Sequence, residues 1–194
     1  LVNPPTTITM WSEGRRLGGV EQEWVDFEDV APVMARSIVA AEDANFCLHW
    51  GFDMGAIRQA IDAGGQRGAS TITQQVAKNV YLWQGRSWPR KAMEAVLTPL
   101  IELTWSKRRI IEVYMNVAEM GEGVFGVQAA AQHWFKKDAA RLTSTEAARI
   151  AAILPDPKAR NPARPSRFVE RRATAIADGA NTIRADGRAA CFED

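Results

Sequence analysis

Apolar residues recur every three or four positions along almost the whole chain, and this spacing limits the fold more than any other feature. It is the period of a helix with one buried face, whereas a half-buried strand alternates at every second residue. No alternating run is long enough to predict a strand, so we expect at most one short hairpin. The sequence therefore predicts a mainly α fold.

Capping and breaking residues mark the ends of the expected helices. Thr71 with Gln74, and Thr143 with Glu146, fit capping boxes, in which side chains satisfy free backbone N–H groups at a helix start. The expected helices cover about 30–42, 54–63, 71–80, from 89 onward with a kink near Pro99, 106–116, 129–135, 143–154 and 167–179. Residues 64–69 are expected to form a Gly-rich loop, and residues 179–194 a loose tail.

Composition is that of an ordinary globular domain. With 46% hydrophobic residues and a formal net charge of +1, the 194-residue chain lacks the basic excess of a nucleic-acid-binding protein. Cys47 and Cys191 form no Cys-x-x-Cys pair and the two histidines lie far apart, which argues against a structural zinc site. We expect two free thiols, because unpaired buried cysteine is common; a disulfide in an oxidising compartment is the alternative.

Two polar clusters precede the middle of the chain. Residues 42–51 place Glu42 at the end of an apolar helix beside Phe46 and Trp50, where desolvation would raise its pKa toward that of a general base. Taken alone, a solvated helix end is the better interpretation. Residues 68–79 combine a Gly loop, hydroxyls and a helix start, which suits an anion or sugar as well as an ordinary capped helix.

Two further clusters are also ambiguous when taken singly. Arg86, Arg90, Lys91 and Glu94 fit either a surface ion pair at i, i+4 spacing or a cationic cradle for a pyrophosphate. Residues 107–116 alone indicate only an amphipathic helix.

The four clusters become specific when they are taken in order. They read Glu-Asp-x-x-Phe-x-x-His-x-Gly, Ser-Thr-Ile-Thr-Gln-Gln-x-x-Lys-Asn, Arg-Lys-x-x-Glu and Lys-x-x-Ile-x-Glu-x-Tyr-x-Asn. This series resembles the motifs of the peptidoglycan glycosyltransferase family (glycosyltransferase family 51), and a chain this short, without a transpeptidase module, resembles its monofunctional branch. The resemblance spans about residues 3–172. Ala69, where Gly is frequent, and Met115, where Leu is frequent, are conservative departures.

The resemblance implies a bilobed, lysozyme-like glycosyltransferase domain over residues 1–178, with a smaller membrane-facing lobe at about 80–105. It implies a reaction in which the GlcNAc 4-hydroxyl of lipid II attacks C1 of the MurNAc of a growing lipid-linked glycan chain. Inversion gives a β-1,4 bond, and undecaprenyl pyrophosphate leaves.

The resemblance also implies roles for single residues. Glu42 matches the general base, and Glu94 matches a second catalytic acidic residue, which would orient Arg90, help to hold a divalent ion or position the donor. The residues expected to bind substrate are Asp43, Phe46, His49, Ser70, Thr71, Gln74, Gln75, Lys78, Asn79, Arg86 and Arg90. No metal-ligand set is expected, and a divalent cation such as Mg²⁺ or Mn²⁺ is an optional cofactor that the sequence does not require.

The polyprenyl tails of these substrates place the expected site of action at the cytoplasmic membrane. We expect one transmembrane anchor before Leu1, a catalytic domain on the periplasmic side, and an interfacial contact through the Trp-bearing stretch 80–105. Within this chain no apolar run approaches the roughly 20 residues of a membrane span. The expected partners are lipid II, the growing chain and the membrane, with cell-wall synthesis proteins as candidates and no nucleic acid.

Two other functions compete with polymerisation. A lysozyme-like glycan-cleaving enzyme would share a catalytic Glu but have no use for the cations Lys78, Arg86 and Arg90. A non-catalytic cell-wall-binding module would be expected to have lost Glu42 or the second motif, and both are intact.

Overall fold

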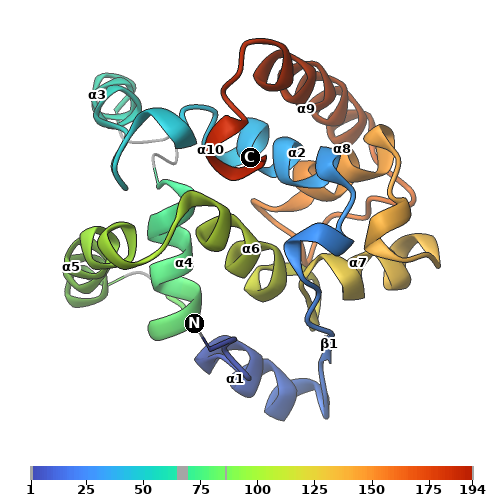
Figure 1. Cartoon of the computed structure of the whole chain (residues 1–194). Coiled ribbons are helices and arrows are strands. Elements are labelled where there is room, and N and C mark those ends of the chain that lie inside the picture. Colours follow the sequence, from blue (N-terminus) through green and yellow to red (C-terminus); the bar gives the residue numbers. More distant parts are fainter. Residues whose placement is uncertain (1, 65–69, 86, 194) are drawn as a thin grey trace.

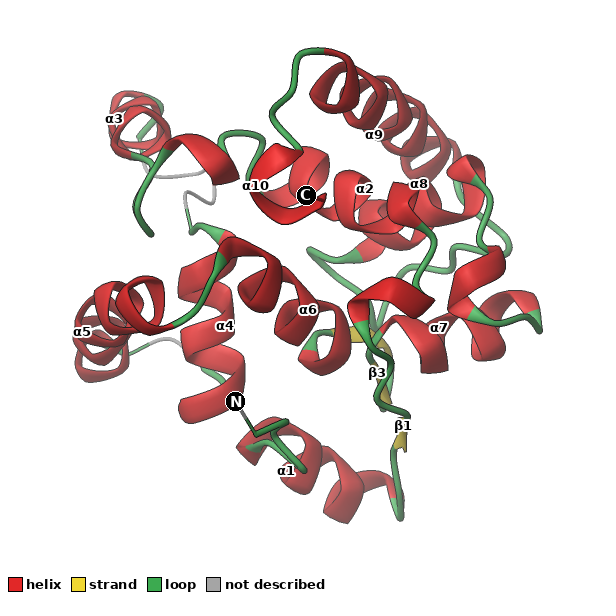
Figure 2. Ribbon diagram, viewed as in Figure 1, coloured by secondary structure: helices red, strands yellow, loops and turns green. Residues whose placement is uncertain are grey.

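The computed structural model describes residues 2–64, 70–85 and 87–193 and confirms the mainly α fold class (Figures 1 and 2). Its α-helices are α1 (Ile8–Leu17), α2 (Pro32–Glu42), α3 (Met54–Asp62), α4 (Ile72–Tyr81), α5 (Trp88–Thr104), α6 (Lys107–Val117), α7 (Val127–Phe135), α8 (Ser144–Ile153), α9 (Arg167–Ala185) and α10 (Ala190–Glu193). Short 3-10 helices are η1 (Phe27–Asp29), η2 (Phe46–Leu48) and η3 (Ala139–Arg141).

Two groups of helices form the body of the molecule. In one group α2, α8 and α9 pack on one another, and in the other α4 packs on α5 and α6 (Figure 1). One apolar cluster joins the groups, with Ile38 of α2, Ile72 of α4 and Ile111 of α6 all completely buried. The buried side chains Ala148, Ala151 and Ala152 let α8 approach α9 closely.

The sheet has one strand more than the sequence predicted. β2 (Glu119–Gly121) and β3 (Val124–Phe125) form the expected kind of hairpin, and β1 (Glu21–Gln22) adds in parallel on the other side of β3. The prediction of a hairpin at most is wrong because a two-residue strand is too short to leave an alternating pattern. Gly126 follows β3 with a φ of 82°, and a Cβ there would lie 2.8 Å from the Asn116 carbonyl oxygen, so this turn requires glycine.

Most predicted helix boundaries are confirmed. α2 ends at Glu42, and the capping boxes of Thr71 and Thr143 are both formed. α5 begins at Trp88 and runs through Pro99. α1 was not predicted, because it presents only Thr9 and Met10 to the interior and so lacks a long apolar stripe. Of the predicted loop at 64–69, residues 65–69 lie outside the described residues.

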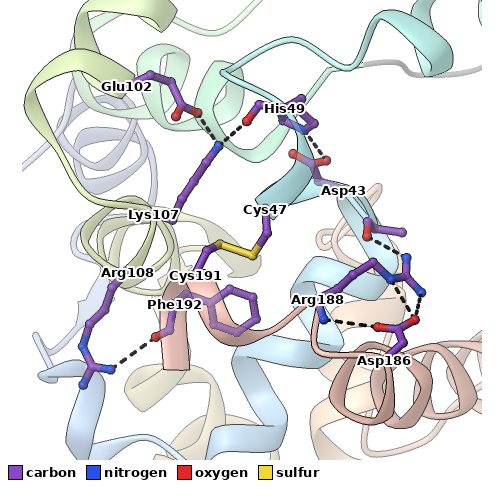
Figure 3. The surroundings of a disulfide bond; sticks show 11 residues. Asp43, Cys47, His49, Glu102, Lys107, Arg108, Asp186, Arg188, Cys191 and Phe192 are labelled. Carbon is purple, nitrogen blue, oxygen red and sulfur yellow. Dashed lines mark hydrogen bonds and ion pairs between the residues drawn. A yellow bond between two sulfur atoms is a disulfide. The ribbon is translucent and has the colours of Figure 1, made fainter. Parts of the chain in front are cut away.

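The C-terminal residues are docked, which corrects two predictions. α9 continues to Ala185, and residues 186–193, here called the C-terminal strap, bring α10 against α6 and η2. Cys191 forms a disulfide with Cys47 (Figure 3). The neighbouring Phe192 is fully buried and packs near Phe46, with ring centroids 6.3 Å apart. The predictions of free thiols and of a loose tail are wrong, because the contacts that hold the strap come from residues far away in the sequence.

The stretch 80–105 divides into a buried and an exposed face. Leu82 and Ile101 are buried, whereas Leu97 and Trp105 pack partly against the core. The exposed large side chains are Tyr81, Trp83, Trp88, Met93, Val96, Leu100 and Leu103. Within the part of the chain that the structure describes, no helix has both the length and the apolar composition needed to cross a membrane.

Candidate active site

A cavity of about 790 Å³ lies between the end of α2 and the helices α4 and α5, which is a volume typical of small-molecule sites. Its lining residues are Ala41, Glu42, Ser70, Gln74, Gln75, Lys78, Gln84, Gly85, Arg90, Lys91, Glu94, Leu154, Pro155 and Arg172. We call the side formed by Glu42 and Arg172 the α2 wall, and the side that carries Lys78, Arg90, Lys91 and Glu94 the α4–α5 wall.

Glu42 is the last residue of α2 and the central group of the α2 wall. Its Oε2 accepts a hydrogen bond of 2.9 Å from Nε2 of Gln75, and its Oε1 lies 3.8 Å from a guanidinium nitrogen of Arg172. Burial raises the pKa of Glu42 above 4.5, and this outweighs the lowering by Gln75, Arg172 and Lys78. A carboxyl group with a raised pKa at a cavity surface suits proton transfer near neutral pH.

The neighbouring carboxylate, Asp43, makes hydrogen bonds within the protein instead of lining the cavity. One oxygen lies 2.8 Å from Nε2 of His49, and the other accepts a 3.0 Å hydrogen bond from the backbone N–H of Ile72 (Figure 3 shows the first contact). Asp43 therefore joins the end of α2 to the start of α4. Because α2 ends between the two carboxylates, one faces the cavity and the other supports its wall.

The α4–α5 wall concentrates positive charge. Glu94 is almost fully buried and pairs with Arg90 and with Lys91, whose Nζ lies 2.9 Å from Oε2. Burial and the nearby Arg90 lower the pKa of Lys78, and the same two causes lower that of Lys91. Among the described residues, Lys78 has no carboxylate within 4.0 Å. Cations that repel one another at a cavity surface favour a multiply charged anion between them.

A buried polar network links α4 and α5, which line the cavity, to α6. Glu102 accepts a hydrogen bond of 2.6 Å from Thr73. It also accepts one of 2.8 Å from Lys107, and Lys107 donates a second hydrogen bond to the carbonyl of His49 at 2.9 Å (Figure 3 shows both contacts of Lys107). Gly51 is required here, because its φ is 82° and a Cβ would lie 2.5 Å from the side chain of Thr98. The network fixes the loop after α2 against α4, α5 and α6.

The structure brings most of the predicted site residues into one cavity. The predicted residues that line it are Glu42, Ser70, Gln74, Gln75, Lys78, Arg90 and Glu94. Four others, Asp43, Phe46, His49 and Thr71, lie in the supporting wall. Phe46 is fully buried and Thr71 is 2% exposed, and neither lines the cavity, so a direct contact of these two residues with substrate stays a prediction. Asn79 is partly buried outside the lining, and Arg86 lies outside the described residues.

Arg172 and Tyr114 interact with predicted site residues but were not themselves predicted from the sequence. Arg172 comes from α9 and reaches the cavity because α9 packs on α2. Tyr114, fully buried on α6, donates a 3.2 Å hydrogen bond to Oε1 of Gln75. Tyr114 belongs to the fourth sequence motif, which was its only signal, and no motif marked Arg172.

One group of side chains has the composition of a metal site. Asp43, His49 and Asp53 each offer a ligand atom within 4.8 Å of the others. Asp53 already accepts hydrogen bonds from Asn45 and from the backbone N–H of Ala56, and Asp43 is bonded to His49 and Ile72. The contacts present account for these carboxylates as structural groups, and none of the three lines the cavity.

The chain is similar to known proteins over nearly all of its length. Residues 12–181 match the family model described as Transglycosylase. A biosynthetic peptidoglycan transglycosylase of Jannaschia sp. (strain CCS1) is 61% identical over 192 residues, covering 99% of this chain and 80% of that protein. Proteins of the same name from Xanthomonas campestris pv. campestris and Pseudomonas entomophila are 50% and 49% identical; each alignment covers 89% of this chain, and 74% and 77% of the respective relative.

Proposed function

The chain belongs to the transglycosylase family, and on that premise we propose that it polymerises the glycan strands of peptidoglycan from lipid II. The observation that carries the proposal is the placement of a carboxyl group with a raised pKa and a group of partly buried cations on different walls of one cavity. Such an arrangement serves the two ends of a glycosyl transfer, the attacking hydroxyl and the departing pyrophosphate.

Glu42 is the proposed general base. A sugar hydroxyl is a poor nucleophile, so a positioned carboxylate takes its proton as the 4-hydroxyl of the acceptor GlcNAc attacks C1 of the donor MurNAc. Glu42 has to be ionised to act as a base. Because its pKa is raised toward neutral pH, the ionised carboxylate binds a proton more strongly than an ordinary glutamate does. Direct displacement with inversion requires no enzyme nucleophile, and the product is a β-1,4 bond.

Lys78, Arg90 and Lys91 are the proposed binding groups for the pyrophosphate. This leaving group departs as an anion, so fixed positive charge stabilises it more than a proton donor would. The guanidinium fork of Arg90 matches two phosphate oxygens, and the lysines act as point charges. Arg86 stays a sequence-based candidate for the same role.

Glu94 is proposed to position these cations rather than to transfer a proton. Its two oxygens are engaged by Arg90 and Lys91, which supports the first of the three roles that the family resemblance left open. A divalent cation such as Mg²⁺ or Mn²⁺ would, in this proposal, be bound with the pyrophosphate, because the carboxylates of the wall are already occupied.

We also propose that the domain works on the periplasmic face of the cytoplasmic membrane, held there by an anchor before Leu1. The exposed apolar side chains of α5, among them Trp88, Val96 and Leu103, would rest on the bilayer as a second contact. Such a contact would bring the polyprenyl tail of the substrate beside the α4–α5 wall, where the pyrophosphate has to bind.

An assay of the purified protein with lipid II in detergent tests the proposal. Glycan polymer of increasing length is the expected product. Cleavage of preformed glycan would support a lysozyme-like hydrolase, and binding without turnover would support a cell-wall-binding module; either result would overturn the proposal.

A further inference from the structure

A short chain of hydrogen bonds reaches Glu42 from the core of the molecule. The hydroxyl of Tyr114 on α6 donates to Oε1 of Gln75 at 3.2 Å, and Nε2 of Gln75 on α4 donates to Oε2 of Glu42 at 2.9 Å. Three helices are thus linked through one amide. Gln75 lies between the two other groups, so its orientation determines what Glu42 contacts.

Tyr114 leaves Gln75 only one orientation. Its side chain is 2% exposed, and Gln75 is the only hydrogen-bond partner of its hydroxyl among the described residues. Burial and the nearby Glu42 raise the pKa of Tyr114 well above 10, so the phenol stays neutral and remains a donor. A donor on one side of the amide requires the carbonyl to face it, which turns the NH₂ group toward Glu42.

We propose that Tyr114 is a positioning residue for the transfer reaction: by orienting Gln75 it holds a neutral N–H donor on Glu42 and so sets the pH range in which Glu42 accepts a proton. This inference rests on the proposed role of Glu42 as the base. It assigns Gln75, expected from the sequence to bind substrate, to the support of Glu42.

The other groups around Glu42 show why a neutral donor matters. Lys78 on α4 and Arg172 on α9 face it as cations, and Asp43 follows it in the chain as an anion. Arg172 stays 3.8 Å from Oε1, and within the described part of the chain Gln75 alone donates a hydrogen bond to the carboxylate. An amide holds the carboxylate in place with less effect on its basicity than a cation in direct contact would have.

The experiment compares pH profiles of polymerisation for the wild type and Tyr114→Phe, using lipid II in detergent. The substitution removes one hydroxyl and keeps the ring. Without the phenol, Gln75 no longer presents its NH₂ reliably, and the pKa of Glu42 rises further because it loses a hydrogen bond that lowers it. We expect the acidic limb of the profile to move to higher pH by about 0.5–1 unit, with most of the activity regained on the alkaline side.

Two further variants keep the test decisive. Gln75→Leu should give the same shift, and the double variant should shift no further than Gln75→Leu alone, because both substitutions interrupt one chain. The control is Ser37→Ala, which removes a buried hydroxyl from α2 that has no hydrogen-bond partner among the described residues, and its profile should equal that of the wild type.

The outcomes separate this inference from the proposed function. Unshifted profiles, a loss of activity equal at every pH, or fully additive shifts would overturn the role of Tyr114 while polymerisation by the wild type stands. If the wild type itself forms no polymer, the proposed function fails first. If Tyr114→Phe does not fold, as judged by circular dichroism, an unshifted profile of Gln75→Leu still overturns the role of Tyr114, because that role acts only through Gln75, and a shifted profile supports the chain of hydrogen bonds.

Discussion

On the α2 wall, Glu42 meets one neutral donor and a guanidinium 3.8 Å away, whereas on the α4–α5 wall Glu94 is held directly by Arg90 and Lys91. The same residue type is therefore left reactive on one wall and neutralised on the other. Burial raises the pKa of Glu42, and burial with mutual repulsion lowers the pKa of Lys78 and Lys91.

This difference indicates that the two walls have separate functions, proton transfer on the α2 wall and anion binding on the α4–α5 wall. The α2 wall keeps a carboxylate whose proton affinity is increased, and the α4–α5 wall keeps cations whose charge is costly until an anion arrives. On both walls, groups that are costly to keep charged are retained because binding or proton transfer requires them, and such local destabilisation is typical of functional sites. The substitutions below test whether the walls are separable in this way.

The largest effect is expected from Glu42→Gln. Loss of the base should lower kcat by about 100-fold or more, measured as polymer formed from saturating lipid II. The folded protein binds a proton at Glu42 more tightly than the unfolded chain does, so the stability from this group is present below pH 4.5 and is lost as pH rises through the raised pKa. At pH 7 the variant should therefore have a higher Tm than the wild type.

Glu94→Gln provides the opposite case for stability. It leaves Arg90 and Lys91 without their buried partner, so its Tm should fall. If Glu42→Gln also lowers Tm, or retains near wild-type turnover, the contrast between the two carboxylates is wrong.

The second-largest effect on activity is expected from Lys78→Ala, which removes one cation of the α4–α5 wall. We expect kcat/KM for lipid II to fall by about 10- to 100-fold, because one charge-assisted contact to the pyrophosphate is lost. Initial rates at substrate concentrations below KM measure this. Arg184→Ala, on the exposed C-terminal part of α9, is the control for losing one positive charge and should leave kcat/KM unchanged. Equal losses in both variants would mean that general electrostatic attraction, and not the wall, binds the substrate.

The sequence predicted the parts of the molecule whose signals are local. Helices with a long apolar stripe and a capping box, such as α4 and α8, were located to within a residue or two. The ordered motifs identified Glu42, Lys78 and Glu94, and these three residues line one cavity. These features depend on residue spacing along one element, which a sequence displays directly.

The features that were missed depend on tertiary contact. Arg172 reaches Glu42 only through the packing of α9 on α2, and the C-terminal strap is held by Cys47, 144 positions before Cys191. No periodicity connects such residues, so the sequence alone favoured free thiols and a loose tail.

A smaller effect is expected where the α4–α5 wall continues into an apolar face. Val96 and Leu103 lie seven positions apart on the same side of α5 and are 63% and 70% exposed. The double variant Val96→Asp/Leu103→Asp should weaken binding to phosphatidylcholine vesicles by about 10-fold, measured by flotation, because two apolar side chains no longer insert. Phe168→Asp on α9, which is 52% exposed beside the other group of helices, should bind as the wild type does. Equal binding by all three proteins would contradict a membrane contact through α5.

The smallest effect on activity is expected from Cys191→Ser, which separates the support of the α2 wall from its chemistry. The disulfide joins the strap to the loop that follows Glu42, and Arg36 with Glu193 adds an ion pair of 2.6 Å to the same attachment. Closing so long a loop restricts the unfolded chain, so removal of the bond should lower the free energy of unfolding by about 2–5 kcal/mol, measured by urea denaturation. Cys47→Ser breaks the same bond and should give the same value.

Because Asp43 and the network around Glu102 still hold the loop, kcat and KM at 25 °C should stay within about two-fold of the wild type, a range that corresponds to less than 0.5 kcal/mol. A large loss of kcat in a folded Cys191→Ser protein, with KM unchanged, would show instead that the strap positions Glu42, and the α2 wall would then depend on residues beyond 181, where the family match ends.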